Sequence, residues 1–405
     1  MRTCRNCGAS LTETFADLGH QPLANAYLHE DQLDEPETTY PLHAMVCSEC
    51  LLVQVGDSAT PAEIFEDYAY FSGTSPTWVE HARAYATQMH HRIDLDAESL
   101  VVEVGSNDGY LLQHFKDDGI PVLGIEPAAN IACAAMERDI PIRCAFFNLE
   151  LARELHKAGI QADLLCGTNV LAHVPDIHSF VAGIKLILSG FGICTMEFPE
   201  IRHLIGQGEF DTIYHEHFHY FSFHTVADIF RANGLEIFDV ESLPTHGGSI
   251  RIFAQHAAGP RSTTPAVGKQ LATEGREGLD QLATHTAFAE RPGLIKADIL
   301  NLLANLKLAG HTIAGYGAPA KGNTLLNYCG IGPDILDYVV DDSPHKQGKY
   351  LPGSHIPIVS RERLLEDPPD YALLLAWNLK EPIMAANPQI HRWIVPFPEL
   401  QIITP

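Results

Sequence analysis

The sequence of 405 residues has no long apolar run and carries few basic residues. A membrane-spanning helix needs about 20 consecutive apolar residues, and no run approaches this length. Only 26 Lys and Arg stand against 51 Asp and Glu, which gives a net charge of −25. This balance argues against nonspecific binding to nucleic acid or to an anionic membrane. Residues 1–4 lead directly into a polar cysteine motif, so we expect no signal peptide and a cytoplasmic protein.

The sequence also has no low-complexity stretch and no short-period repeat. Charged residues make up only 19% of the chain and apolar residues 46%, so we expect folded domains and not extended disorder. The length predicts two or three domains. We place them at residues 1–60, 61–265 and 266–405.

Four of the nine cysteines are paired by spacing, as Cys4-x-x-Cys7 and Cys47-x-x-Cys50. Four thiolates suit tetrahedral Zn²⁺, and they leave no position for a reactive water, so such a metal would be structural. Two redox or disulfide pairs are the alternative. The other cysteines lie in apolar contexts and are expected to be buried thiols; they are Cys133, Cys144, Cys166, Cys194 and Cys329.

A glycine loop follows a short apolar strand at residues 99–104. The loop reads Glu103-x-Gly105-x-x-x-Gly109 and precedes an amphipathic segment, which indicates a strand, a tight turn and a helix start that binds a ligand. A second strand ends in Glu126, which is placed to bind ribose hydroxyls. The G-x-G-x-x-G spacing of a dinucleotide site is missing, so S-adenosylmethionine is favoured over NAD. An ordinary strand-to-helix turn is the alternative.

Alternating strands and helices continue along the chain, and the pattern predicts an α/β fold. A hairpin of two extended runs closes the first alternating region, as a class I methyltransferase sheet requires. Residues 266–310 are helix-rich and read as a connector, and the region after them resembles half of a Rossmann-type sheet. The expected strands are residues 121–125, 162–167, 191–198, 235–240, 249–255, 312–317, 337–340, 371–377 and 391–395, and the expected helices include 180–188 and 225–232.

Residues 214–222 form the densest polar segment of the sequence. Unpaired polar groups are costly to bury, so this segment is expected to serve proton chemistry beside the cofactor. A second metal site and purely structural hydrogen bonding are the alternatives. In an extended segment His215, His217 and His219 would share one face, with Glu216 on the other. That geometry is unfavourable for a metal that uses all four.

Six motifs then occur in a fixed order along nearly the whole chain. Together they resemble the S-adenosylmethionine-dependent C-methyltransferases of nucleotide-linked deoxysugars, whose best-known relatives act on TDP-4-keto sugars in branched-sugar pathways of antibiotics. The motifs are the two C-x-x-C pairs, Tyr70-Phe71-Ser72-Gly73-Thr74-Ser75, Glu103-x-Gly105-x-Asn107-Asp108-Gly109, Tyr214-x-Glu216-His217-x-x-Tyr220-Phe221-Ser222, His246-Gly247-Gly248-Ser249-x-Arg251, and Gly315-x-Gly317-Ala318-x-Ala320-Lys321-Gly322-Asn323.

The resemblance implies a zinc-binding N-terminal domain, a methyltransferase core and a C-terminal Rossmann-like domain, with the sugar nucleotide between the lobes. It also implies that Tyr214, Glu216, His217 and His173 surround the reacting sugar. C-methylation next to a ketone requires loss of a proton to form an enolate, and histidine suits the role of base. We hypothesise that His217 is the base, that Glu216 orients it or binds a sugar hydroxyl, and that Tyr214 or His173 donates to the enolate oxygen.

The remaining candidate residues are assigned to the two ligands. The candidates for the sugar nucleotide are His246, Arg251 and Lys321, since Lys321 at a helix start suits a phosphate. The alternatives are an ion pair within a strand for Arg251 and a purely structural α/β domain around Lys321. Core packing is the alternative role for the tyrosines before the glycine loop. The candidates for the cofactor are Tyr68, Tyr70, Ser72, Gly105, Asn107, Asp108, Glu126 and Asn169.

Three other functions remain open from the sequence. An O- or N-methyltransferase would share the cofactor domain, a zinc-stabilised binding protein would lack catalysis, and an NAD-dependent sugar oxidoreductase would need a different glycine spacing. We expect a monomer or a small homo-oligomer that binds no nucleic acid.

Overall fold

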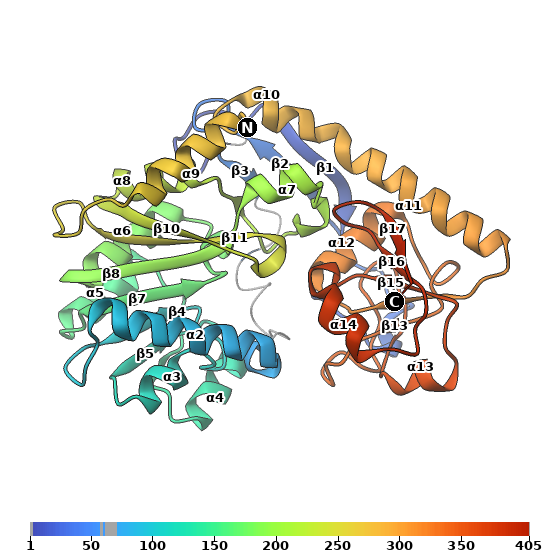
Figure 1. The fold of residues 1–405 in the computed structure, drawn as a ribbon, viewed down its shortest axis with the longest axis horizontal. Helices are drawn as coiled ribbons and strands as arrows, with labels where there is room; N and C mark the ends of the chain where they lie inside the picture. The colour runs from blue at the N-terminus through green and yellow to red at the C-terminus, as the bar shows by residue number, and fades with distance from the viewer. Residues whose placement is uncertain (1–2, 57–59, 61–70, 405) are drawn as a thin grey trace.

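The computed structural model describes residues 3–56, 60 and 71–404, and within these residues the strands form three sheets. Figure 1 shows a lobe built on the first α/β region and a second lobe built on the C-terminal region. The N-terminal sheet and the helices α9 (Pro265–Arg276), α10 (Leu282–Thr286) and α11 (Arg291–Leu308) lie across the top and join the two lobes. The helix-rich character expected of residues 266–310 is confirmed.

The first lobe contains a seven-stranded sheet in the order β10-β11-β8-β7-β4-β5-β6. Its strands run parallel except β11, which is antiparallel to both neighbours. This hairpin closure confirms the class I methyltransferase arrangement. The strands are β4 (Val101–Val104), β5 (Val122–Ile125), β6 (Ile142–Arg143), β7 (Ala162–Thr168), β8 (Leu188–Pro199), β10 (Leu235–Leu243) and β11 (Ser249–His256).

Helices cover both faces of this sheet. Successive side chains of a strand point to opposite faces, and here the apolar side chains on each face pack against helices. Val101 and Leu164 pack with α2 (Pro76–Ile93) and α3 (Leu112–Asp117). Val102 and Leu165 face the opposite core. Burial on both faces explains why the strands read as continuous apolar runs in the sequence. The helices of that second core are α5 (Leu149–Lys157), α6 (Ile177–Ile187) and α8 (Phe223–Ala232), and α4 (Ala129–Glu137) follows β5.

The C-terminal lobe contains a six-stranded sheet in the order β14-β13-β12-β15-β16-β17, parallel except at β17. This confirms the second Rossmann-like region, with two short strands, β14 and β17, that the sequence pattern did not indicate. The strands are β12 (Ile313–Tyr316), β13 (Val339–Val340), β14 (Ile358–Val359), β15 (Tyr371–Leu374), β16 (Trp393–Val395) and β17 (Gln401–Ile403), and the helices are α12 (Ala320–Cys329), α13 (Glu362–Glu366) and α14 (Lys380–Ala386).

The N-terminal sheet is antiparallel and has the order β1-β2-β3-β9. Its first three strands are β1 (Glu13–Gln21), β2 (Tyr40–Val46) and β3 (Val53–Val55). The fourth, β9 (His219–Tyr220), comes from the polar segment that is far away in the sequence. The N-terminal sheet therefore fixes one end of this segment directly.

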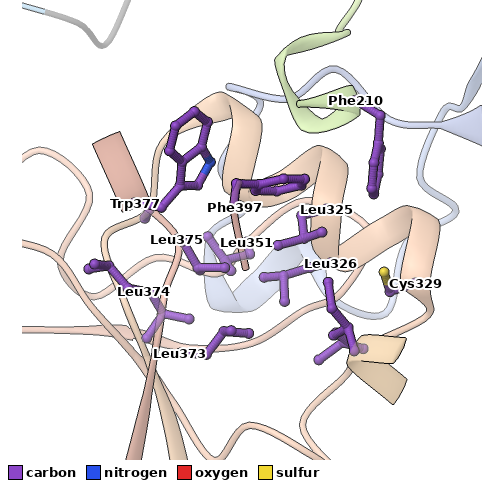
Figure 2. Packing of buried hydrophobic residues seen from close by; sticks show 14 of the residues in the cluster. Phe210, Leu325, Leu326, Cys329, Leu351, Leu373, Leu374, Leu375, Trp377 and Phe397 are labelled. Carbon is purple, nitrogen blue, oxygen red and sulfur yellow. The ribbon is translucent and has the colours of Figure 1, made fainter. Parts of the chain in front are cut away.

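One apolar core joins the N-terminal sheet, the C-terminal lobe and the chain that leads into the polar segment. Phe210 lies in η4 (Phe210–Thr212), which follows α7 (Ile201–Gln207), and its ring centre is 5.8 Å from that of Phe397 and 5.1 Å from that of Tyr328. Figure 2 shows Phe210 pointing toward Phe397 and the leucines of α12. This packing fixes the other end of the polar segment against the second lobe.

The sequence predicts that the five cysteines outside the two C-x-x-C motifs are buried, and this prediction is partly wrong. Cys166, Cys194 and Cys329 are buried, as expected, but Cys133 and Cys144 are exposed. Cys133 lies on the outer side of α4, where an apolar local sequence does not force burial. Among the described residues, none of the helices combines the length and apolar character needed to cross a membrane.

Candidate active site and zinc centre

The four cysteines of the two C-x-x-C motifs converge on one point. Their sulfur atoms lie within 4.8 Å of one another, with 3.5 Å between Cys4 and Cys50 and 3.5 Å between Cys7 and Cys47. Sulfur ligands at about 2.3 Å from a tetrahedral Zn²⁺ are about 3.8 Å apart, so this group fits the metal. The prediction of a structural zinc site is confirmed, and four sulfur ligands leave no coordination position for water.

A cavity of about 540 Å³ lies at the carboxyl ends of β4, β5, β7 and β8. Ligands of open α/β sheets bind at this edge. The N-terminal region, the first lobe and the C-terminal lobe all contribute residues to the lining of the cavity. Most of the residues predicted from the sequence meet here, namely Ser72, Gly105, Asn107, Glu126, Asn169, His173, Tyr214, Glu216, His217, His246 and Lys321.

The glycine loop forms one wall of the cavity. Gly105 has a φ of +69°, and a Cβ there would lie 3.0 Å from Cγ2 of Val170, so both the backbone and the space favour glycine. The Asn107 backbone N–H donates to Oε2 of Glu126 at 3.0 Å, and the Ala128 N–H donates to Oε1 at 2.9 Å. Burial raises the pKa of Glu126, and these two backbone bonds oppose that shift. The loop and the Glu126 carboxylate are thus held together at the edge of the cavity, and their binding of the cofactor stays a prediction.

Among the predicted cofactor residues that the structure describes, Asp108 does not line the cavity. Asp108 accepts from the Gly73 N–H at 3.1 Å and pairs with Arg138 at 3.2 Å, so it anchors η2 (Ser72–Thr74) against the glycine loop. Asn107 supports the same contact, since its Oδ1 accepts from the Ser72 N–H at 2.8 Å. Tyr68 and Tyr70 lie outside the described residues.

Residues 214–218 form the next wall of the cavity, and we call them the polar turn. They form a turn and not the extended segment expected from the sequence. The His217 N–H donates to the Tyr214 carbonyl at 3.0 Å and closes the turn. The expected sharing of one face by three histidines is therefore wrong. Glu216 and His217 both line the cavity, whereas His215 contacts the Tyr40 carbonyl at 3.3 Å.

Two histidines and a tyrosine meet at the centre of this wall. Tyr214 Oη lies 2.8 Å from His217 Nε2, and the His173 ring centre lies 4.8 Å from that of His217. Burial lowers the pKa of His217 well below its ordinary 6.5, with a further contribution from His173, although a hydrogen bond to the Thr212 backbone opposes this. Burial also lowers the pKa of His173 to about 4. Both rings are therefore neutral at pH 7, and a neutral imidazole can accept a proton.

Glu216 is held by the N-terminal region. Asn25 Nδ2 donates to Glu216 Oε1 at 2.6 Å, and Asn25 itself lines the cavity. His173 also hydrogen-bonds to the Glu216 backbone. The Asn25 amide thus orients the Glu216 carboxylate toward the cavity. This position suits a carboxylate that binds a hydroxyl group better than one that orients the His217 ring.

The C-terminal lobe contributes two ammonium groups to the cavity. Lys321, at the start of α12, hydrogen-bonds to Asn378 and lies 4.1 Å from the ring centre of Trp377. Burial lowers the pKa of Lys321 to about 8, although Asp211 and Glu209 oppose this shift. Lys346 donates to the Ala318 carbonyl at 2.8 Å. Two cations beside the first turn of a helix can bind an anionic group.

His246 and Arg251, which share one motif, have different environments. His246 lines the cavity, and its Nε2 lies 2.9 Å from Asn169 Nδ2. Arg251 lies outside the lining and pairs with buried Glu197 at 2.6 Å. Glu197 also accepts from Thr245 Oγ1 at 3.0 Å, so Arg251 contributes to the support of the loop that carries His246.

Sequence reasoning missed Asn25, Trp78 and Lys346, which also line the cavity. Trp78 stacks on His81 at 4.9 Å and meets the edge of His246 at 5.1 Å. These three residues belong to none of the six ordered motifs, and their positions next to the cavity depend on contacts between distant segments. An isolated tryptophan among only three in the chain was the one available signal.

Three family models match the chain. A zinc-binding domain matches residues 4–65, a methyltransferase domain matches residues 78–240, and a C-methyltransferase C-terminal domain matches residues 244–398. The chain is also 37% identical over 405 residues to C-methyltransferase NovU of Streptomyces niveus, a match that covers 99% of this chain and 96% of that protein.

Solved methyltransferase structures match the central region at low identity. An S-adenosylmethionine-dependent methyltransferase from Clostridium acetobutylicum ATCC 824 is 8% identical with a TM-score of 0.37, over 44% of this chain and 92% of that chain. Magnesium protoporphyrin IX methyltransferase from Synechocystis PCC 6803 with bound S-adenosylmethionine is 16% identical with a TM-score of 0.33. That match covers 45% of this chain and 79% of that chain. The family assignment does not depend on either structure.

The family models and the relative of near full length agree with the zinc centre and with the methyltransferase sheet. They set aside the O- and N-methyltransferase, oxidoreductase and non-catalytic alternatives. The chain belongs to the family of zinc-containing, S-adenosylmethionine-dependent C-methyltransferases.

Proposed function

We propose that the enzyme methylates a nucleotide-linked keto-deoxysugar at the carbon next to the ketone. The observation that carries this proposal is the Tyr214–His217 pair, 2.8 Å apart, in the same cavity as the glycine loop. A base beside a methyl donor is what carbon methylation requires, because a carbon next to a ketone becomes nucleophilic only after it loses a proton. The family resemblance supports TDP as the nucleotide.

The cofactor is proposed to lie along the glycine loop. Gly105 and Asn107 would hold its methionine part, Glu126 its ribose, and Asn169 the region near the sulfonium. When bound, S-adenosylmethionine supplies a methyl group that its sulfonium already activates. Asn169 Oδ1 is buried and has no hydrogen-bond partner among the described residues, so it can take a donor from a ligand.

His217 is proposed to take the proton from the sugar carbon. The imidazole is neutral at pH 7, so a ring nitrogen can accept a proton, and burial makes this ring a weaker base than an exposed histidine because it lowers the pKa. The electrons of the broken C–H bond would move into the carbonyl and form the enolate. The bound cofactor would supply the methyl group for the new C–C bond, its C–S bond would break with the electron pair going to sulfur, and S-adenosylhomocysteine would leave. Tyr214 or His173 would donate a hydrogen bond to the enolate oxygen, a form of stabilisation that mutagenesis puts at about 2.7–4 kcal/mol per donor.

The rest of the substrate is proposed to extend toward the C-terminal lobe. Glu216 would bind a sugar hydroxyl, and His246 would contact the sugar nucleotide. Lys321 and Lys346 would bind the diphosphate, since both line the cavity beside the start of α12. The site would thereby compensate locally for the net charge of −25, which by itself repels an anion.

Solvent exchange tests the proposal directly. The enzyme is incubated in deuterium oxide with a TDP-linked 4-keto-deoxysugar and S-adenosylhomocysteine, which has no methyl group to transfer. We expect deuterium to enter the carbon next to the ketone, as measured by mass spectrometry, and we expect His217→Asn to stop this incorporation. Absence of incorporation with the wild-type enzyme across a panel of keto-sugar nucleotides would refute carbanion formation on this substrate class.

A further inference from the structure

Arg5 lies inside the first zinc-binding loop, between Cys4 and Cys7, and reaches the polar turn. Its Nη1 donates to the Val55 carbonyl at 2.7 Å and to the Phe218 carbonyl at 3.4 Å. The guanidinium carbon also lies 5.3 Å from the centre of the Phe218 ring. Phe218 directly follows His217 in the chain. The loop that holds the metal therefore contacts the residue next to the proposed base.

Phe218 is held on both sides of its backbone. Its N–H donates to the Ala172 carbonyl at 2.8 Å, and its carbonyl accepts from the Val55 N–H at 3.1 Å. The next residues continue this pairing, because β9 pairs with β3. Ala172 precedes His173, so the same bond also sets the two active-site histidines at their relative positions.

Gln54 connects this contact to the metal ligands. Its Nε2 donates to the sulfur of Cys4 at 3.2 Å, and its Oε1 accepts from the Arg5 N–H at 3.0 Å. Gln54 is 2% exposed and pairs across the sheet with His219. Gln54 thus connects a metal ligand and the Arg5 backbone to the strand that follows His217.

We infer that the zinc-binding loop, through Arg5, positions His217 in the cavity. This inference rests on the proposed function of His217. A misplacement of about 1 Å can cost about 10²-fold in rate, and the carbonyl that Arg5 holds is one residue from the base. Arg5 is therefore a positioning residue, and the zinc domain contributes to turnover in addition to stability.

Arg5→Met tests this inference, because methionine keeps the apolar reach and removes the donors. We expect kcat to fall at least about 10-fold, while the dissociation constant for S-adenosylmethionine changes less than about twofold. Elemental analysis should still find the wild-type zinc content. Arg5→Lys retains one cationic donor and should keep a larger share of kcat. Arg143→Met is the matched control, since that side chain is half exposed and pairs with Glu154 on the surface.

Hydrogen exchange without substrate gives a second measurement that does not depend on the substrate class. Peptides covering residues 213–221 should exchange faster in Arg5→Met than in the wild type, whereas peptides covering residues 101–109 should not change. Equal exchange at residues 213–221, or faster exchange in both regions, would overturn the positioning role. A wild-type enzyme that fails to deuterate any keto-sugar would overturn only the proposed function.

Discussion

The phenol oxygen of Tyr214 lies 2.8 Å from Nε2 of His217, and the two ring centres are 4.1 Å apart. Either atom can carry the shared proton, so the pair can present a neutral imidazole beside a phenol. Burial supports the neutral ring, because it lowers the pKa of His217 well below 6.5. The proposed base and a proposed donor for the enolate oxygen are therefore adjacent in this site.

His217→Asn should lower kcat by about 10²–10⁴, the usual contribution of a general base. Asparagine keeps a polar side chain of similar length but cannot accept the proton at neutral pH. Binding of S-adenosylmethionine, measured by calorimetry, should stay nearly intact, because the glycine loop does not depend on this ring. His215→Asn is the matched control, and it should keep turnover within a few-fold of the wild type. Wild-type turnover in His217→Asn would assign the base elsewhere.

The pH dependence of kcat/KM should show a fall as the pH rises through about 8, the lowered pKa of Lys321. Below that pH the ammonium is charged and can bind the diphosphate, and above it the charge is lost. Lys321→Met should raise KM for the sugar nucleotide and remove this alkaline fall. Rates measured between about pH 6 and about pH 10 give the profile of the free enzyme. A fall that persists unchanged in Lys321→Met would assign it to another group.

Arg251→Met should reduce stability more than substrate binding. The Arg251 and Glu197 side chains are 5% and 2% exposed, and removing one partner of a buried pair costs about 3–5 kcal/mol. Denaturant unfolding measures this loss, and KM for the sugar nucleotide should change much less than in Lys321→Met. The double variant Arg251→Met with Glu197→Gln should recover part of the stability. A normal unfolding free energy with a strongly raised KM would instead show that Arg251 binds substrate.

Elemental analysis should find about one zinc per chain, bound by the four cysteines. Cys47→Ser or a strong chelator should release it and expose the N-terminal sheet, because metal binding and folding of such domains are coupled. Hydrogen exchange should then increase in β3 and β9 together, since the two strands are paired. Two zinc ions per chain would contradict this and would require a second metal site outside the four cysteines.

Phe210→Ala should destabilise the junction of the two lobes by about 3–5 kcal/mol, as for other buried phenylalanines. The side chain is fully buried and packs with Tyr328 and Phe397 (Figure 2). Thermal unfolding measures the loss. Phe191→Ala is the control, because that ring is 76% exposed and should change stability by less than about 0.5 kcal/mol. Equal stabilities of the two variants would mean that the core does not join the lobes.

The sequence predicted the alternation of strands and helices, the closing hairpin and the two cysteine pairs, because each of these depends on residues close together in the chain. The glycine at position 105 was readable for the same reason, since a positive φ constrains the residue locally. The shape of the polar segment was not readable. Alternating polar and aromatic residues suggest a strand, but η4 and β9 hold the ends of residues 214–218 and leave a turn between them.

The sequence by itself determined the fold class, the metal ligands and the set of chemical groups available to the site. Only the tertiary structure decided which of them meet: it placed Glu216 and His217 in the cavity, turned His215 away, and paired Arg251 with Glu197. It also brought Asn25 to Glu216 and Arg5 to Phe218. The physical reason is that local patterns fix backbone periodicity, whereas contacts between segments 190 or more residues apart depend on how whole sheets pack.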